Sequence, residues 1–176
     1  MFRPLLITTL ALSLSSCAIR NVAPSGIVSE EVWLFQVSSQ KDDYSKITSI
    51  KGGRIERPDH TVFLRSQRRE APPSIDQIQI YVIAKTSDWK FLDHAYSIEG
   101  VSLDITVVDR DVRYCSRYGC SLAEHVIVNI NRKYLLSHIN QGLDFKLMGK
   151  NGEQAVHLPA NYIVAFLGSL PSEREF

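Results

Sequence analysis

Short β-favouring segments separated by turn signals constrain the fold of this chain most strongly. Gln77 to Ala84 alternates polar and apolar residues and then becomes apolar on both faces, as expected of a strand that enters the middle of a sheet. The predicted strands cover residues 32–37, 61–64, 77–84, 89–92, 102–108, 112–115, 125–130, 143–148 and 154–158. Because few helices separate them, the sequence predicts a mainly β fold, an antiparallel β-sandwich with two short helices near the C-terminus.

Both predicted helices have recognisable boundaries. Asn131 is placed to cap a helix over residues 132–140, and Gly142 stands just past its end. The second helix, over residues 159–170, begins with a proline, which the first turn of a helix tolerates. Its expected buried stripe consists of Tyr162, Ile163, Phe166, Leu167 and Leu170. Between the two helices, Asn151-Gly152 predicts a hairpin turn.

Two segments are predicted to lie outside the regular core. Residues 38–49 are too polar to be buried. Residues 66–74 contain Pro72-Pro73, which excludes regular structure there.

The first seventeen residues predict export. Arg3 precedes an apolar run of about ten residues, roughly half of the ~20 that a membrane-spanning helix needs. The run ends in Leu14-Ser15-Ser16-Cys17, which has the form of a bacterial lipoprotein cleavage site. The alternative is a buried N-terminal helix with an incidental Cys17, but such a helix would not be expected to place its only cation first and its small residues last.

By resemblance to bacterial lipoproteins, residues 1–16 would be a signal peptide and Cys17 would carry lipid. Three acyl chains give stable anchoring. Ala18 follows the cysteine where an aspartate would favour the inner membrane, so the resemblance implies the outer membrane, with the protein facing the periplasm. We expect residues 17–30 to be a lipidated tether, 31–171 one domain and 172–176 a tail.

The charge balance argues against nucleic acid as a partner. The chain has 20 Lys plus Arg and 19 Asp plus Glu, and Arg3 is the one charged residue that signal removal takes away. The mature chain would therefore have no net charge and no basic footprint for nucleic acid.

Cys115 and Cys120 are predicted to form a disulfide, because an exported protein folds in an oxidising compartment and Cys17 would be consumed by lipid. Gly119 can supply the positive φ that the turn between them requires. A zinc site would need two further ligands with suitable spacing, and a dithiol redox site normally has a two-residue spacer. The five histidines do not show zinc-site spacing: His60, His94, His125, His138 and His157. We expect no metal and no cofactor.

No catalytic motif is present in the sequence: it has no nucleophile elbow, no zinc-protease motif and no glycine-rich phosphate loop. Glu124 and His125 would point to opposite faces of a strand and are predicted to be a solvated edge rather than an acid–base couple. Asp104, Asp109 and Asp111 crowd one strand end but lack a calcium-binding loop, so a solvated strand end is predicted. These observations predict a protein that is not an enzyme.

Positive charge concentrates in one short region. Its members are Arg54, Arg57, Arg65, Arg68 and Arg69. They are either a patch that meets anionic lipid headgroups or an acidic partner, or arginines scattered over loops. Tyr114 and Tyr118 form a second candidate contact surface, whereas Trp33 and Trp89 are expected in the core.

The second half of the chain resembles a set of uncharacterised bacterial envelope proteins. The matching positions are residues 89–92, Gly119-Cys120, 134–142, 159–162 and Phe166-Leu167. It is also similar to the invasion-associated locus B family in its Gly-Cys step before a helix, although Ala165 stands where that family has glycine. The resemblance implies a sandwich fold and an envelope setting, with no catalytic residue.

These observations predict a membrane-anchored, non-enzymatic interaction or assembly subunit with an envelope protein as partner, accessory to a secretion or surface machine. The alternatives are a small-ligand or glycan-binding periplasmic module and, third, a hydrolase.

Overall fold

The structure, a computed structural model, describes residues 37–69 and 77–171. The strands are β1 (Ser38–Asp42), β2 (Ile47–Lys51), β3 (Ile55–Glu56), β4 (His60–Arg69), β5 (Gln77–Thr86), β6 (Leu92–Ser97), β7 (Ser102–Ser116), β8 (Gly119–Ile130), β9 (Leu143–Gly149) and β10 (Gly152–Leu158). The helices are α1 (Arg132–Leu136) and α2 (Ala160–Ser169). The predicted signal peptide, Cys17, the tether, Trp33 and the tail lie outside the described residues.

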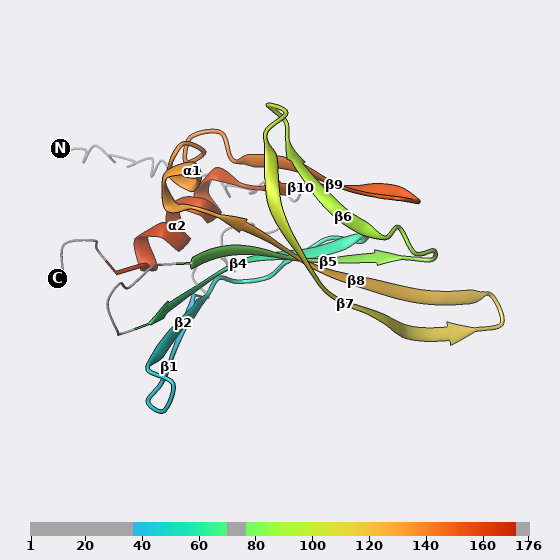
Figure 1. Cartoon of the computed structure of the whole chain (residues 1–176), viewed down its shortest axis with the longest axis horizontal. Coiled ribbons are helices and arrows are strands. Elements are labelled where there is room, and N and C mark those ends of the chain that lie inside the picture. Colours follow the sequence, from blue (N-terminus) through green and yellow to red (C-terminus); the bar gives the residue numbers. More distant parts are fainter. Residues whose placement is uncertain (1–36, 70–76, 172–176) are drawn as a thin grey trace, which may run out of the picture.

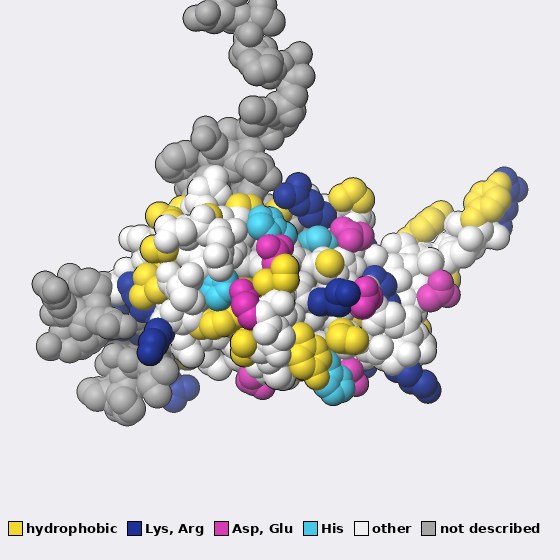
Figure 2. Space-filling model, turned by 90° about the horizontal axis from the view of Figure 1, so that it is seen from above, with side chains coloured by type: hydrophobic (Ala, Val, Ile, Leu, Met, Phe, Trp, Pro, Cys, Tyr) yellow, Lys and Arg dark blue, Asp and Glu magenta, His cyan; other side chains and the backbone are white. Residues whose placement is uncertain are grey.

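The strands pair antiparallel in the order β1-β2-β4-β5-β8-β7-β6-β9-β10, with β3 beside β4 (Figure 1). The long strand β7 belongs to two sheets, because Ser102 and Leu103 pair with β6 and the residues from Asp104 onward pair with β8. The far end of the β7–β8 hairpin projects from the body of the molecule in Figure 1 and again in Figure 2. The predicted mainly β, antiparallel fold with two short helices near the C-terminus is confirmed.

One hydrophobic core lies between the two sheets. Alternate residues of β4, β5 and β8, such as Leu64, Ile80 and Val128, are fully buried and meet Leu147 and Leu158 of β9 and β10. The predicted stripe is all buried, four of its residues on α2 and Leu170 just past the end of the helix: Tyr162, Ile163, Phe166, Leu167 and Leu170. The period-two alternation of the strands thus gives each sheet one core-facing side, as in a sandwich.

Residues 89–91 form a strap that crosses from one sheet to the other, although sequence analysis predicted a strand there. Glu124 of β8, 0% exposed, accepts hydrogen bonds from the backbone N–H groups of Lys90 (2.6 Å), Phe91 (3.0 Å) and Leu92 (2.9 Å). Arg110 Nε lies 3.2 Å from the same carboxylate and supplies a positive charge. The backbone N–H groups of Lys90 and Phe91 therefore donate to a side chain and not to a neighbouring strand. For this reason β6 begins only at Leu92.

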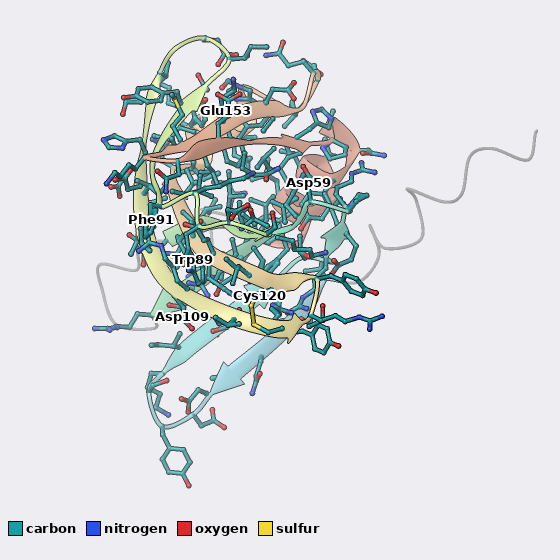
Figure 3. The ribbon with its side chains drawn as sticks, turned by 90° about the vertical axis from the view of Figure 1, so that its right-hand side faces the viewer. Asp59, Trp89, Phe91, Asp109, Cys120 and Glu153 are labelled. Carbon is teal, nitrogen blue, oxygen red and sulfur yellow. A yellow bond between two sulfur atoms is a disulfide. The ribbon has the colours of Figure 1, made fainter. Side chains whose placement is uncertain are left out.

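The other side of the strap is bound to the β9–β10 hairpin. The Lys90 carbonyl accepts from Asn151 N at 3.0 Å, and Lys90 Nζ donates to the carbonyl of Glu153 at 2.8 Å. At Gly149, an added Cβ would lie 2.4 Å from the carbonyl oxygens of Lys90 and Phe91, so only glycine fits. In Figure 3, Trp89 and Phe91 lie between Glu153 on β10 and Asp109 on β7. The strap thereby fastens the two sheets to each other.

The predicted solvated edge at Glu124 is wrong. Strand β8 begins at Gly119 and places Glu124 in mid-strand on the inner face. The prediction that Glu124 and His125 point to opposite faces holds. Trp89, expected in the core, is the first residue of the strap and is only half-buried.

Other predicted boundaries also shift. The segments 102–108 and 112–115 are one strand, β7, whose register with β8 shifts after Val107 and again after Val112. Residues 38–49 are largely the β1–β2 hairpin, with β1 exposed throughout, and β4 continues to Arg69. Helix α1 ends at Leu136, although Asn131 caps it as predicted by accepting from Tyr134 N at 2.7 Å.

Tyr162 joins α2 to the first sheet through two buried hydrogen bonds. Its hydroxyl donates to the Gly53 carbonyl at 2.8 Å and accepts from Leu64 N at 2.9 Å. At Gly52, an added Cβ would lie 2.5 Å from this hydroxyl. Burial of the side chain raises the pKa of Tyr162 to about 12, because the ionised phenolate would lose its hydration.

We predict that Tyr162→Phe lowers the free energy of unfolding by about 1–3 kcal/mol near pH 8, since Leu64 N and the Gly53 carbonyl lose their partner. The pKa of Tyr162 is higher in the folded protein than in the unfolded chain. Its contribution to folding stability is therefore fully present below the unfolded pKa and is lost as pH rises through the folded pKa. Between pH 10 and 12 the wild type should therefore lose stability that Tyr162→Phe keeps. Urea titrations at pH 8 and pH 11 measure this difference.

The matched control is Tyr44→Phe, because Tyr44 is fully exposed. The difference in the free energy of unfolding between wild type and Tyr162→Phe should be smaller at pH 11 than at pH 8, by on the order of 1 kcal/mol. A gap that is the same at both pH values would show that the phenol is not held neutral by burial.

Candidate functional site

A groove of about 430 Å³ lies on the outer face of the first sheet. Period-two alternation directs Phe63 and Arg65 of β4 outward, where the register sets Phe63 opposite Tyr81 and Arg65 opposite Lys51. The residues that matter here are Lys51, Arg54, Phe63, Arg65, Tyr81 and His125, together called the cationic groove. Four strands therefore contribute to a single surface.

Two stacked aromatic rings form the floor of the cationic groove. The rings of Phe63 and Tyr81 are 5.0 Å apart and inclined by 16°. Lys51 Nζ lies 4.5 Å from the Phe63 ring centre, and the Arg65 guanidinium lies 5.0 Å from the Tyr81 ring centre. Arg54 also lies over the Phe63 ring, 5.6 Å from its centre. Phe63 is only 4% exposed, so its ring does not offer a free stacking surface.

The cationic groove carries an excess of positive charge. In the described part of the chain, Lys51, Arg54 and Arg65 form no ion pair with a carboxylate. Partial burial, together with repulsion from Arg54 and Arg65, holds the pKa of Lys51 below its ordinary value. An anion placed between these groups would remove that repulsion.

The five predicted patch arginines do not lie together. Arg54 and Arg65 line the cationic groove, and Arg69 is exposed farther along the same face of β4. Arg68 belongs to the alternate face of β4, and Arg57 lines a different groove. The period-two alternation of side chains along β4 could have predicted that Arg68 lies on the opposite face from Arg65 and Arg69.

Lys51 was not predicted to be a member of the site. Its position opposite Arg65 depends on the β2–β4 register, which no local pattern reveals.

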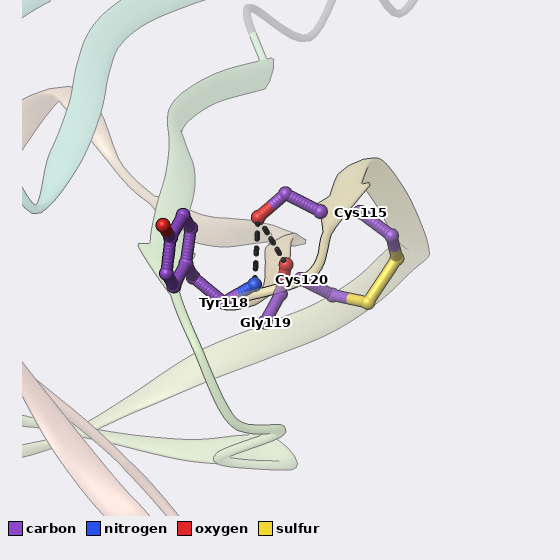
Figure 4. The surroundings of a disulfide bond; sticks show 5 residues. Cys115, Tyr118, Gly119 and Cys120 are labelled. Carbon is purple, nitrogen blue, oxygen red and sulfur yellow. Dashed lines mark hydrogen bonds between the residues drawn. A yellow bond between two sulfur atoms is a disulfide. The ribbon is translucent and has the colours of Figure 1, made fainter.

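The second candidate surface is the projecting end of the β7–β8 hairpin, residues 107–121, here called the arm. The predicted disulfide closes its tip: the Cys115 and Cys120 sulfurs are 2.05 Å apart, and the two residues pair across the strands (Figure 4). Gly119 has the expected positive φ of 130°. Ser116 Oγ accepts from Tyr118 N at 3.1 Å, so the turn is fixed by hydrogen bonds as well as by the cross-link.

The arm exposes large hydrophobic side chains. Val112, Tyr114 and Tyr118 are 57%, 68% and 83% exposed, and Val107 and Val108 add to them nearer the body. In Figure 2, hydrophobic and basic side chains share the end of this projection. Isolated exposed hydrophobics are ordinary, but a rigid ribbon that carries several at once is typical of a contact surface.

A second groove, of about 540 Å³, lies on the outer face of β6, β9 and β10, where Tyr96, Met148 and Ala155 contribute apolar surface. At its margin Asp59 accepts from Gln154 Nε2 at 2.7 Å and lies 2.8 Å from His60 Nδ1. Burial raises the pKa of Asp59, but the hydrogen bonds from Gln154 and His60 outweigh it, so the pKa lies below its ordinary value. The polar and charged groups at this margin are thus already hydrogen-bonded to one another.

One trio resembles a hydrolase site in composition. Ser137 Oγ lies 3.1 Å from His138 Nδ1, and His138 Nε2 lies 3.7 Å from Glu99. However, both Ser137 Oγ (2.7 Å) and His138 Nδ1 (2.8 Å) face the Tyr134 carbonyl, to which each donates. A nitrogen that donates to a carbonyl cannot accept a proton from the serine, so the trio fixes the end of α1.

The described residues hold no group of three or more His, Cys, Asp or Glu side chains arranged to bind a metal ion. The prediction that Asp104, Asp109 and Asp111 crowd one strand end is wrong, because Asp104 lies near the start of β7 and the other two lie in its middle. Asp104 accepts from Asn129 at 2.9 Å, and Asp111 lies between Arg113 (3.6 Å) and His125 (3.5 Å). Asp109 is exposed on the arm.

Among the described helices, neither is long and apolar enough to cross a membrane. Comparison of the chain with protein-family models, with curated proteins and with solved structures found no match.

Proposed function

We propose that this protein is a non-enzymatic interaction or assembly subunit of the bacterial cell envelope. Lipid on Cys17 anchors it at the outer membrane, and the domain faces the periplasm, where it is accessory to a secretion or surface machine. The Leu14 to Cys17 motif supports the anchor, and the disulfide of the arm is in keeping with an oxidising compartment.

The observation that carries the proposal is the arm. A two-stranded ribbon on its own is marginally stable, and here pairing with β5 at its base and a disulfide at its tip hold it in one shape. Preorganisation of this kind lowers the entropy cost of binding. Exposed Tyr114 and Tyr118 are the side-chain type that anchors protein interfaces.

The positive charge at the tip of the arm indicates which charge its partner carries. Residues 112–121 contain Arg113 and Arg117 and no Asp or Glu. Arg113 pairs with Asp111, whereas Arg117 stacks at 4.6 Å on Tyr118 and has no carboxylate partner in the described residues. The partner is therefore an envelope protein with an apolar cleft rimmed by carboxylates.

A photo-cross-linking amino acid at Tyr118 should capture one discrete envelope protein in intact cells, and Tyr114→Ser in the same chain should reduce the adduct at least several-fold. Val164 is the matched control position, because it is 51% exposed and α2 lies at the other end of the molecule from the arm in Figure 1. Recovery of no protein above background from the Tyr118 position, or equal adducts from both positions, would contradict the proposal.

The anchor has a test of its own. Cys17→Ser should give an uncleaved or soluble form, because the sulfur that accepts the lipid is lost. Membrane fractionation of cells that express either form measures this, with Cys115→Ser/Cys120→Ser as a control that keeps Cys17. If Cys17→Ser remains with outer membranes as the parent does, the anchor is wrong.

One observation favours the small-ligand or glycan-binding alternative: the groove of about 540 Å³ beside Tyr96. The floor of this groove is apolar, and the charged groups at its margin already have hydrogen-bond partners. Such a groove suits a ligand with an apolar face. A ligand that protects Tyr96 but not Tyr118 from modification would support this second candidate.

A further inference from the structure

A ladder of polar side chains crosses the outer face of the first sheet and ends at the cationic groove. Arg65 Nε donates to Gln79 Oε1 at 2.8 Å, Gln79 Nε2 donates to Asn129 Oδ1 at 2.8 Å, and Asn129 Nδ2 donates to Asp104 Oδ2 at 2.9 Å. Each pair is also opposite in the register of neighbouring strands. The sheet itself therefore sets the direction of every amide in the ladder.

The ladder holds the Arg65 guanidinium in place without neutralising it. Only Nε is engaged, by a neutral amide, and the Tyr81 ring covers one face of the group at 5.0 Å. The carboxylate of Asp104 lies three strand spacings away, or about 14 Å. The two terminal nitrogens of Arg65 have no hydrogen-bond partner in the described residues, so a positioned fork of donors faces the groove.

Cation–π contacts do not account for this arrangement by themselves. Such contacts attract each cation to a ring, but they leave its charge in place, and three cations that converge on one groove repel one another. Lys51 and Arg54 extend over Phe63 beside Arg65, and in the described residues none of the three forms a close ion pair, although the charge of Arg54 reaches Glu56. A compact anion with more than one negative charge would complement these three cations.

We propose that the cationic groove binds a phosphate group, with Arg65, Lys51 and Arg54 in direct contact and Gln79 and Asn129 as positioning residues. A guanidinium fork recognises phosphate oxygens through paired N–H donors, and a lysine ammonium contributes a point charge. The phosphate comes from a lipid headgroup or is free in solution. The arm contributes only Arg113 to the edge of this groove, and Arg113 pairs with Asp111, so the phosphate site does not depend on the proposed partner protein.

The direct test is titration of the full-length protein with inorganic phosphate, followed by calorimetry and by side-chain NMR of Lys51. Wild type should bind saturably, and the pKa of Lys51 should rise on saturation, because the anion removes the repulsion. Arg65→Gln and Lys51→Gln should each weaken binding roughly tenfold or more, as expected for a lost charged hydrogen bond. Lys150→Gln, an exposed lysine in the β9–β10 turn, should bind as wild type does.

The positioning role of Gln79 separates this proposal from a purely structural ladder. Gln79→Glu keeps an acceptor for Arg65 Nε but places a negative charge beside it, so phosphate should bind even more weakly than in Gln79→Leu. A merely structural role would give the opposite order, since glutamate would hold Arg65 better than leucine does. Thermal unfolding of each variant checks that it folds.

Vesicles distinguish the two sources of phosphate. If binding to phosphatidylcholine vesicles that contain phosphatidic acid is tighter than binding to inorganic phosphate and is lost in Arg65→Gln, the ligand is a lipid headgroup. Binding of inorganic phosphate alone, with the same dependence on Arg65, assigns a soluble phosphate. Absence of saturable binding to both by wild type, or undiminished binding by Arg65→Gln, overturns the proposal.

Discussion

The buried carboxylate of Glu124 is the interaction on which the rest of the structure depends. A carboxylate without water is costly unless donors and a positive charge surround it, and here three backbone N–H groups and Arg110 do so. The interaction is directional, because it fixes where the chain leaves the first sheet and enters β6. Without the Glu124 carboxylate, the backbone N–H groups of Lys90, Phe91 and Leu92 would lose their acceptor. The second sheet would then lose its attachment beside Gly149.

Strand β8 links this structural role to both candidate surfaces. Glu124 faces inward and holds the strap, whereas the next residue, His125, faces outward and lines the cationic groove, where its Nδ1 lies 3.0 Å from the Tyr81 hydroxyl. Farther toward its start, the same strand becomes one half of the arm, so the rigidity of the arm derives from the pairing of β8 with β5. Fixing β8 therefore orients the groove and the arm together.

Local signals in the sequence predicted the local features well. Alternation identified the inner residues Val126 and Val128, and the stripe on α2 identified Tyr162 and Phe166. The expected oxidising compartment, with Gly119 in the turn, predicted the disulfide. The strap was not predictable in this way, because Glu124 binds backbone N–H groups more than thirty residues away and every residue but proline presents such a group. The cationic groove was only partly predictable, since Arg65 was recognised but its neighbour Lys51 depends on register.

Amide hydrogen exchange of the native protein tests the role of Glu124 most directly. The account predicts that the N–H groups of Lys90, Phe91 and Leu92 exchange as slowly as those of Val126 and Val128 in the core, although residues 89–91 lie outside any strand. Glu124→Gln should speed exchange at these three amides first, and Glu153→Gln, which alters an exposed carboxylate, should not. Rapid exchange of the three amides in the wild type, as in an unattached loop, would contradict the account.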